Sequence, residues 1–358
     1  MRKLVIAAVL LLILLAAGWY AGETWLSNRA REMVGGSGQI TAAEVTPLRN
    51  PARVGLRLQD VDYGTAEAGF SAPDLEVYAP VSAPNTMTVD LPRQMQLRLG
   101  GAPIELTLEG GSARASISPT HEMTVRRAGV DARGLAVGGI EALQALDLDA
   151  RLVHRGAAAP QGSAGAYAID LSASGIALGA LPERMEIAGP VQLWLSAVPG
   201  QAVLDGRAPP PAPTGIQTPG IEIAIGEMQA RLIGRIEADE NGYAMGEAAF
   251  YTDDARGFVE AGVAAGLIPQ RGAMLANALI GNLAETGSPA DQSSAGTVPE
   301  TARDRAETAP PLSGEQAMDQ VVALPPPAPG QIRLPLVLRD GEMRLGPVKL
   351  GPAPRMIR

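Results

Sequence analysis

Histidine and cysteine offer little chemistry in this sequence. The only histidines of the 358 residues are His121 and His154, which fall on expected strands or turns. As a metal pair they would need a third ligand and convergent geometry, so solvent-exposed positions are the preferred interpretation. There is no cysteine. Its absence removes disulfides, thiolate metal sites, iron–sulfur clusters and cysteine nucleophiles from consideration.

Two pairs of carboxylates are candidates for acid–base work. Asp147 and Asp149 share one face of an expected strand and could exchange a proton or bind a cation. A solvated outer face explains the same spacing, and we prefer it. Asp253 and Asp254 come just before a segment with helical spacing. We expect them to cap the start of that helix.

Motifs for nucleophilic, metal-dependent or phosphate chemistry are missing from the sequence. No Gly-x-Ser-x-Gly elbow, His-Glu-x-x-His pair or phosphate-binding loop occurs. Gly35-Gly36-Ser37-Gly38 has no buried strand before it and no helix after it, which predicts a flexible joint. We therefore expect a non-enzymatic protein with no catalytic residue, no cofactor and no metal ion.

The composition excludes further classes of protein. Lys+Arg 29 against Asp+Glu 38 gives a net charge of -9, which is wrong for a generally basic nucleic-acid binder. Hydrophobic residues at 46% and charged residues at 19% are typical of a chain that folds. Aromatic residues make up only 3%, so the core must be aliphatic and stacking platforms for bases or sugars are not expected.

The N-terminus carries a membrane-segment pattern. Arg2 and Lys3 precede an uncharged apolar run over residues 4–22. At about 1.5 Å per residue this run would form a helix of roughly 28 Å, close to the ~30 Å hydrocarbon thickness of a bilayer. The positive pair keeps residues 1–3 in the cytoplasm and exports the rest. The alternative is a cleaved signal peptide, but Leu15 or Trp19 would occupy the −3 position, where small residues are required.

The body of the chain, from about residue 52 to 195, alternates large apolar residues with polar or small ones, which predicts β-strands. One predicted hairpin turns at Gly100-Gly101. The apolar positions of the expected strands are Val54, Leu56 and Leu58; Met95, Leu97 and Leu99; Ile104, Leu106 and Leu108; Leu146, Leu148, Ala150 and Leu152; Tyr167, Ile169 and Leu171; and Val191, Leu193 and Leu195.

Proline and helical spacing interrupt the strands in the second half. Residues 207–219 contain a proline cluster, which predicts an extended connection in place of a central strand. Strands resume with Ile221, Ile223 and Ile225, and a turn is expected at residues 239–242. One or two short helices are predicted near residues 257–284.

We predict five parts along the chain. Residues 1–22 form the transmembrane signal-anchor, 23–38 a juxtamembrane helix and flexible joint, 39–284 a β-rich domain, 285–330 a disordered and proline-rich insertion, and 331–358 a β-hairpin that returns to the domain. The expected fold class is mainly β: an N-terminal transmembrane helix followed by antiparallel sheet, arranged as a groove or a sandwich.

The sequence resembles a known family. The resemblance lies in four features: the basic anchor; Arg49-Asn50-Pro51; Phe70-Ser71-Ala72-Pro73 followed by Pro84-Asn85; and the closing stretch from Leu338 to Pro347. They are similar to an uncharacterised bacterial envelope family, domain of unknown function 2125. The layout more distantly resembles AsmA- and TamB-type envelope proteins. That resemblance implies an inner-membrane anchor and a periplasmic β-groove that shelters lipid acyl chains.

Two functions follow as expectations. In the first, the periplasmic sheet binds or transfers a lipid in a hydrophobic groove, with the bilayer contacted through residues 4–22. In the second, the sheets close on each other and the protein is an envelope scaffold or assembly factor acting through protein partners. No nucleic-acid partner is expected. The candidate apolar ligand face consists of Val54, Leu56, Leu58, Leu97, Leu99, Ile104, Leu106 and Leu108.

Overall fold

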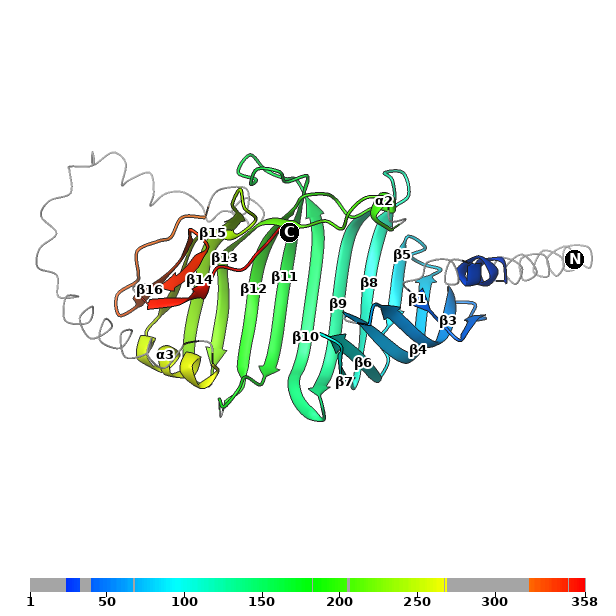
Figure 1. The fold of residues 1–358 in the computed structure, drawn as a ribbon, viewed down its shortest axis with the longest axis horizontal. Coiled ribbons are helices and arrows are strands. Elements are labelled where there is room, and N and C mark those ends of the chain that lie inside the picture. The colour runs from blue at the N-terminus through cyan, green and yellow to red at the C-terminus, as the bar shows by residue number, and fades with distance from the viewer. Residues whose placement is uncertain are drawn as a thin grey trace, which may run out of the picture. The chain divides into compact units, whose positions relative to one another are not determined.

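The computed structural model describes residues 24–32, 40–66, 68–181, 183–204, 207–266, 268, 322–346 and 348–357. Figure 1 shows their strands and helices as a ribbon coloured along the chain. They form two compact units, the first ending at Asp149 and the second beginning at Ala150. The predicted anchor, the joint at 35–38, residues 269–284 of the region predicted to hold one or two short helices, and most of the insertion lie outside the described residues. Within the described ranges, no helix is both long and apolar enough to cross a membrane.

The first unit is an antiparallel sheet whose strands alternate apolar and polar residues, as the sequence predicts. The strands are β1 (Ile40–Thr41), β2 (Glu44–Pro47), β3 (Arg53–Gly64), β4 (Ala68–Pro80), β5 (Thr86–Asp90), β6 (Gln94–Leu99), β7 (Ala102–Thr107), β8 (Gly110–Ser118) and β9 (Thr124–Val137), with β10 (Ile140–Val153) running past the end of the unit. The central strand β4 pairs with β6 through residues 68–71 and with β5 through residues 76–78, so the sheet divides at β4.

The predicted glycine-turn hairpin is confirmed. β6 and β7 pair in antiparallel register with Leu97 opposite Ile104. Gly100 and Gly101 make the turn with φ of 61° and 82°, a backbone region that side chains disfavour.

In the second unit, each strand from β11 onward pairs antiparallel with the next wherever the register is defined. The strands are β11 (Gly165–Ile176), β12 (Met185–Leu195), β13 (Pro213–Ile225), β14 (Met228–Ala238), β15 (Ala244–Thr252), β16 (Ile332–Arg339), β17 (Glu342–Leu345) and β18 (Val348–Pro352). The predicted turn at 239–242 is present, and Asp239 Oδ1 accepts from the backbone N–H groups of Asn241 and Tyr243. β16 follows β15 in the sheet although more than 75 residues separate them in the chain, so the C-terminal hairpin pairs with this unit.

The prediction that residues 207–219 contain no central strand is wrong for its second half. β13 begins at Pro213 and pairs with a strand on each side. Proline is tolerated because Pro219 falls where the pairing is interrupted on both sides of β13. Against β14, the register shifts between Thr218 and Ile221 of β13. Against β12, it shifts between Ala188 and Gln192 of β12. A strand interrupted at a bulge does not require the missing N–H.

Short helices complete the described structure. They are residues 24–32, α2 (Gln201–Leu204) and α3 (Ala255–Ala264). The capping prediction for α3 is confirmed: Asp254 is the N-cap, and its carboxylate accepts from the N–H of Gly257 at 2.8 Å. α3 also confirms the first of the helices predicted near 257–284.

Candidate functional site

The two histidines occupy exposed positions with local partners. His121 Nδ1 lies 2.9 Å from Thr120 Oγ1. His154 Nδ1 accepts from the N–H of Gly156 at 3.1 Å. Each ring therefore supports its own turn. The described part of the chain contains no group of three His, Cys, Asp or Glu side chains that could hold a metal ion.

The candidate carboxylates also have structural surroundings. Asp149 lies 3.5 Å from Arg127 Nε across the strands, and Asp147 is exposed on the same face. Asp253 is exposed beside the helix cap that Asp254 provides. Asp149 has a guanidinium as its partner and Asp254 has a backbone N–H. The first pair therefore belongs to the sheet surface, and the second pair to the start of a helix.

Register places Leu97, Leu99, Ile104 and Leu106 on one face of the hairpin of β6 and β7, and Phe70, opposite Leu97, packs against the buried cluster that contains Leu58. Leu97 is opposite both Ile104 on β7 and Phe70 on β4. Directly opposed residues point to the same side of a sheet. Leu99 is 55% exposed and Leu58 only 6%. The remaining candidates are half-buried except Leu108, which is buried just beyond β7; those half-buried are Val54, Leu56, Leu97, Ile104 and Leu106.

Part of this face is already covered. Leu58, Val45 and Val61 form a small buried cluster, against which Leu56 and Ala30 of helix 24–32 pack. Arg31 of the same helix donates to the carbonyl of Val45 at 2.6 Å. The helix thus covers the β2 end of the face, and the Leu97 end keeps more of its area exposed.

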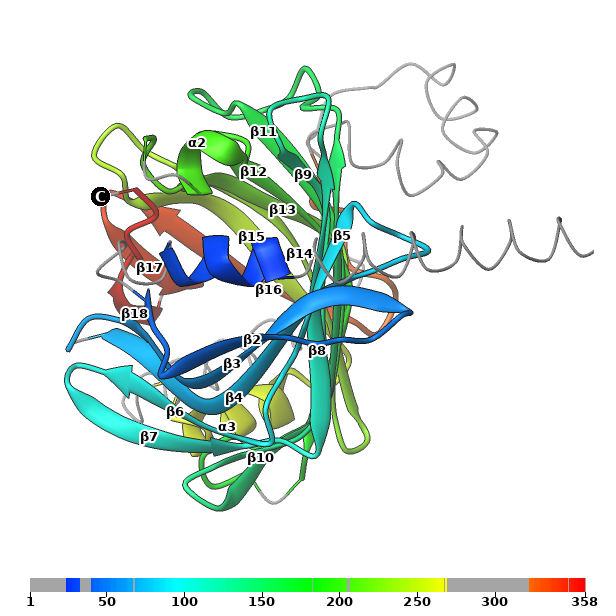
Figure 2. The ribbon, with the colours of Figure 1, turned by 90° about the vertical axis from the view of Figure 1, so that its right-hand side faces the viewer.

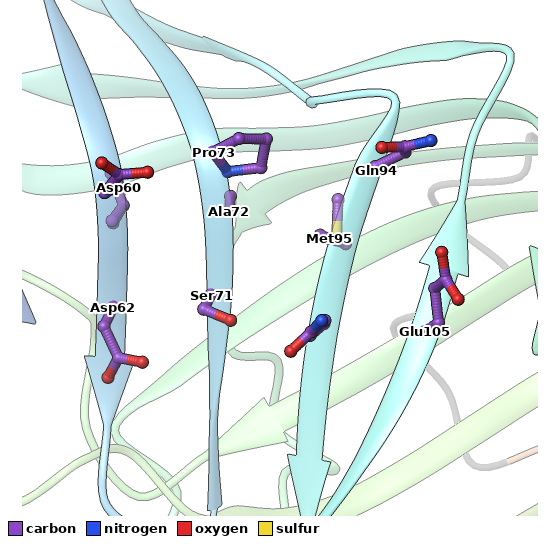
Figure 3. A pocket seen from close by; sticks show the side chains of 10 residues that line it. Asp60, Asp62, Ser71, Ala72, Pro73, Gln94, Met95 and Glu105 are labelled. Atoms are coloured by element: carbon purple, nitrogen blue, oxygen red, sulfur yellow. The ribbon is translucent and has the colours of Figure 1, made fainter.

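A polar hollow of about 380 Å³ lies at the division of β4 (Figure 3). Asp62, Ser71, Gln96 and Glu105 are successive cross-strand partners on the face opposite Leu97. Arg98 donates to both carboxylate oxygens of Asp62, at 2.5 and 2.8 Å, and these hydrogen bonds lower the pKa of Asp62 below its ordinary value. Val61, Ala72, Pro73 and Met95 also line the hollow, so its carboxylates and amides interrupt an apolar surface.

The second unit carries a larger aliphatic face that our sequence prediction did not select as a site. Two rows of side chains that face each other across neighbouring strands build it. The rows are Tyr167–Leu193–Ile216–Ile236, across β11 to β14, and Ile221–Leu232–Phe250–Leu334, across β13 to β16. The rows lie on the same face because Leu232 of one and Ile236 of the other are four residues apart on β14.

Most of this face is only half-buried. Ile216 is 37% exposed, and six of the other seven side chains in the two rows are of intermediate exposure. Tyr167 is the buried exception at 5%, and burial raises its pKa to about 12. α3 packs against Leu334 at one end of the face, and Ala353 joins a buried cluster with Leu338 at another.

The opposite face of the same unit is deeply covered and combines buried glutamines with hydrophobic side chains such as Trp194 and Ile233. Gln192 and Gln217 face each other across β12 and β13 and are 2% and 1% exposed. Trp194, 1% exposed, donates its indole N–H to the Arg155 carbonyl at 3.0 Å and lies under the Arg235 guanidinium at 4.9 Å.

Two segments supply this cover. Gly215, opposite Trp194, leaves room for Pro160: a Cβ at Gly215 would lie 2.5 Å from Pro160 Cγ. Residues 322–325 cross further along the face, where Leu324 packs on the buried cluster of Ile233, Ala249 and Tyr251, and Tyr251 Oη donates to the Pro325 carbonyl at 2.7 Å. The unit thus covers this mixed face deeply and leaves its aliphatic face half exposed.

Sequence could have indicated the second-unit face, because Ile221, Ile223 and Leu193 follow the same alternation as the first-unit candidates. Because prolines cluster at 209–213, the sequence predicts an extended connection there, and Ile216 is therefore missing from the predicted apolar strand positions.

Comparison with known proteins identifies the family. No curated protein and no solved structure matches the chain. The comparison does not show the wider likeness to AsmA-type proteins. A family model, described as an uncharacterised protein conserved in bacteria (DUF2125), matches residues 39–354. The chain therefore belongs to the DUF2125 family, as its sequence motifs predict.

Proposed function

We propose that this protein is a non-enzymatic component of the bacterial envelope that holds the apolar chain of a lipid on the aliphatic face of its second unit. Residues 4–22 anchor it in the inner membrane, and both units lie in the periplasm. The observation that carries the proposal is the unequal burial of the two faces of this unit: Gln217 is 1% exposed and the adjacent Ile216, on the other face, is 37% exposed. A continuous row of partly exposed aliphatic side chains suits an apolar ligand.

The size of the face suits a long alkyl chain. The two rows together cross from β11 to β16, and neighbouring strands lie about 4.8 Å apart, which gives a width of roughly 24 Å. Burying one CH₂ group is worth about 0.8 kcal/mol, so a long acyl chain gains on the order of 10 kcal/mol before the costs of ordering it. Binding of this kind needs no reactive side chain.

The proposal also applies to the candidate ligand face of the first unit, although its evidence comes from the second unit. Leu97, Leu99, Ile104 and Leu106 offer a second, smaller aliphatic area in the same protein. We assign it the same class of ligand, and a Leu99→Asp variant tests it separately.

The test is native mass spectrometry of the full-length chain, purified from a lipid-containing bacterial host and released from detergent. A matched pair of variants distinguishes the two faces of the second unit: Ile216→Asp on the aliphatic face and Met245→Asp on the opposite face. Met245 is 45% exposed and Ile216 is 37% exposed, so both variants place a carboxylate at a similarly accessible strand position.

We expect a phospholipid adduct on the wild type and on Met245→Asp, and its loss from Ile216→Asp. Circular dichroism melting must show that both variants remain folded. A wild-type chain without lipid, or equal adducts on the two variants, would contradict the proposal.

A second candidate function is an envelope scaffold that acts through protein partners. Residues 325–329 favour it, because they are exposed while Tyr251 and the packed Leu324 hold one end in place. Prolines here fix an extended conformation that protein grooves recognise. Crosslinks from this segment to one partner, together with a lipid-free wild type, would establish the scaffold in place of the lipid-binding function.

A further inference from the structure

A further hollow, of about 510 Å³, lies on the covered face of the second unit. β14, β15 and β16 run side by side (Figure 2) and supply most of its lining, and Val322 and Leu324 of the crossing segment supply the rest. Small-molecule sites in proteins occupy roughly 300–1,000 Å³, so its volume suits a ligand of that class. We call it the Arg333 hollow, after the β16 side chain that lines it.

Three of the four charged side chains that line the Arg333 hollow have ion-pair partners. Arg235 and Glu237 pair with each other. Glu247 Oε1 lies 3.9 Å from a terminal guanidinium nitrogen of Arg339. Each of these pairs is neutral as a whole, so together they neither require nor exclude a charged ligand.

Arg333 is the fourth charged side chain, and in the described part of the chain it has no counter-ion. Its Nε is buried and donates to no acceptor there. A guanidinium stays protonated at physiological pH, so the hollow keeps one uncompensated positive charge. Covering a charge without a partner is costly, whereas a carboxylate can accept from two guanidinium N–H groups at once. The hollow therefore suits a ligand with a single carboxylate.

An apolar stretch separates Arg333 from the nearest carboxylate of the hollow along the sheet. Arg333 is opposite Tyr251 on β15, and Glu247 is four residues away along that strand, or roughly 14 Å at about 3.4 Å per residue. Between them on the same face lies Ala249, which belongs to the buried cluster against which Leu324 packs. Since Leu324 also lines the hollow, a ligand that is bound at Arg333 meets an aliphatic side chain before it reaches Glu247.

We propose that the Arg333 hollow binds a small, water-soluble organic acid, with its one carboxylate paired to Arg333 and a short alkyl chain against Leu324. The site is on the face opposite the proposed lipid surface, so it depends neither on lipid binding nor on the membrane anchor. Both the charge and the chain contribute to recognition. An acid without the chain, or a chain that carries a positive charge, should therefore bind more weakly.

The test is isothermal titration calorimetry of the full-length chain in detergent, with a detergent blank and three probes. Hexanoate is the expected ligand type, hexylammonium has the same alkyl chain with the opposite charge, and acetate has the same charge without the chain. Arg333→Gln removes the cation and Arg333→Lys keeps it. The matched control is Arg231→Gln: Arg231 is in the same cross-strand row, opposite Tyr251, but it pairs with Glu222 at 3.4 Å and does not line the hollow.

We expect hexanoate to bind the wild type at one site per chain, about ten-fold more tightly than hexylammonium or acetate. Arg333→Gln should weaken hexanoate binding about ten-fold, Arg333→Lys should restore part of it, and Arg231→Gln should leave it unchanged. Circular dichroism melting shows whether each variant is folded, and the comparison of probes on the wild type needs no variant. The proposal is overturned if hexanoate does not bind, if hexylammonium binds equally well, or if hexanoate binding is unchanged in a folded Arg333→Gln chain.

Discussion

Replacement of Trp194 by alanine should strongly destabilise the second unit. The indole is 1% exposed and a buried tryptophan removes 150–250 Å² from water, worth about 4–6 kcal/mol at ~25 cal/mol per Å². Its hydrogen bond to the Arg155 carbonyl adds about 1 kcal/mol, and the Arg235 guanidinium above the ring about 0.5–2 kcal/mol. Local collapse recovers part of the sum, so we expect a loss of about 3–5 kcal/mol.

The chain provides a control of identical chemistry. Trp25 is 68% exposed, so Trp25→Ala should change the free energy of unfolding by less than about 0.5 kcal/mol. Because Trp194→Ala could unfold the unit outright, Trp194→Phe is the second variant. It keeps most of the packing and removes the N–H donor, with an expected cost of about 1–2 kcal/mol.

Urea unfolding of the full-length variants, followed by far-ultraviolet circular dichroism, measures these differences. The expected order of stability is wild type and Trp25→Ala, then Trp194→Phe, then Trp194→Ala. Equal losses for the two alanine variants would refute the argument that covering the face of Trp194 and Gln217 stabilises the second unit.

Three further changes test individual contacts. A Cβ at Gly234 would lie 2.3–2.8 Å from atoms of the opposing strand, so Gly234→Ala should cost about 1–3 kcal/mol in urea unfolding. Asp254→Ala removes the α3 cap and should cost about 0.5–2 kcal/mol, whereas Asp253→Ala next to it should cost less than about 0.5 kcal/mol. Arg98 lowers the pKa of Asp62 in the folded state, so the pair stabilises above the unfolded pKa of ~3.9 and the effect disappears as pH falls through the folded pKa. Asp62→Asn should therefore be less stable than wild type at neutral pH and equal to it in acid, and a difference that persists in acid would contradict this assignment.

Sequence predicted local structure well where one residue type determines it. Gly100 and Gly101 make the turn that only glycine allows easily, and Asp254 caps the helix that follows it. Alternation of apolar residues located the strands because its period matches the pleat. The prediction fails at Pro219, because a proline lacks the N–H that a central strand normally donates. A register shift on both sides removes that requirement, and it depends on neighbouring strands that the local sequence does not specify.

Alternation shows which face of a strand is apolar but not which face is covered. At Leu58 the apolar face is closed by a helix that precedes it in the chain, and at Ile216 a face of the same pattern is half exposed. The difference arises from long-range cover: residues 322–325 return from more than 70 residues beyond Tyr251 to cover the opposite side of the second unit. Gln192 and Gln217 lose hydration under this cover, which costs free energy where no partner replaces the water. Gln217 Oε1 accepts from Arg235 and from the N–H of Val322, each at 3.4 Å, whereas Gln192 Oε1 has no hydrogen-bond partner among the described residues. The aliphatic side chains of the other face need no such partners, so the lipid chain that we propose would compete for no hydrogen bond there.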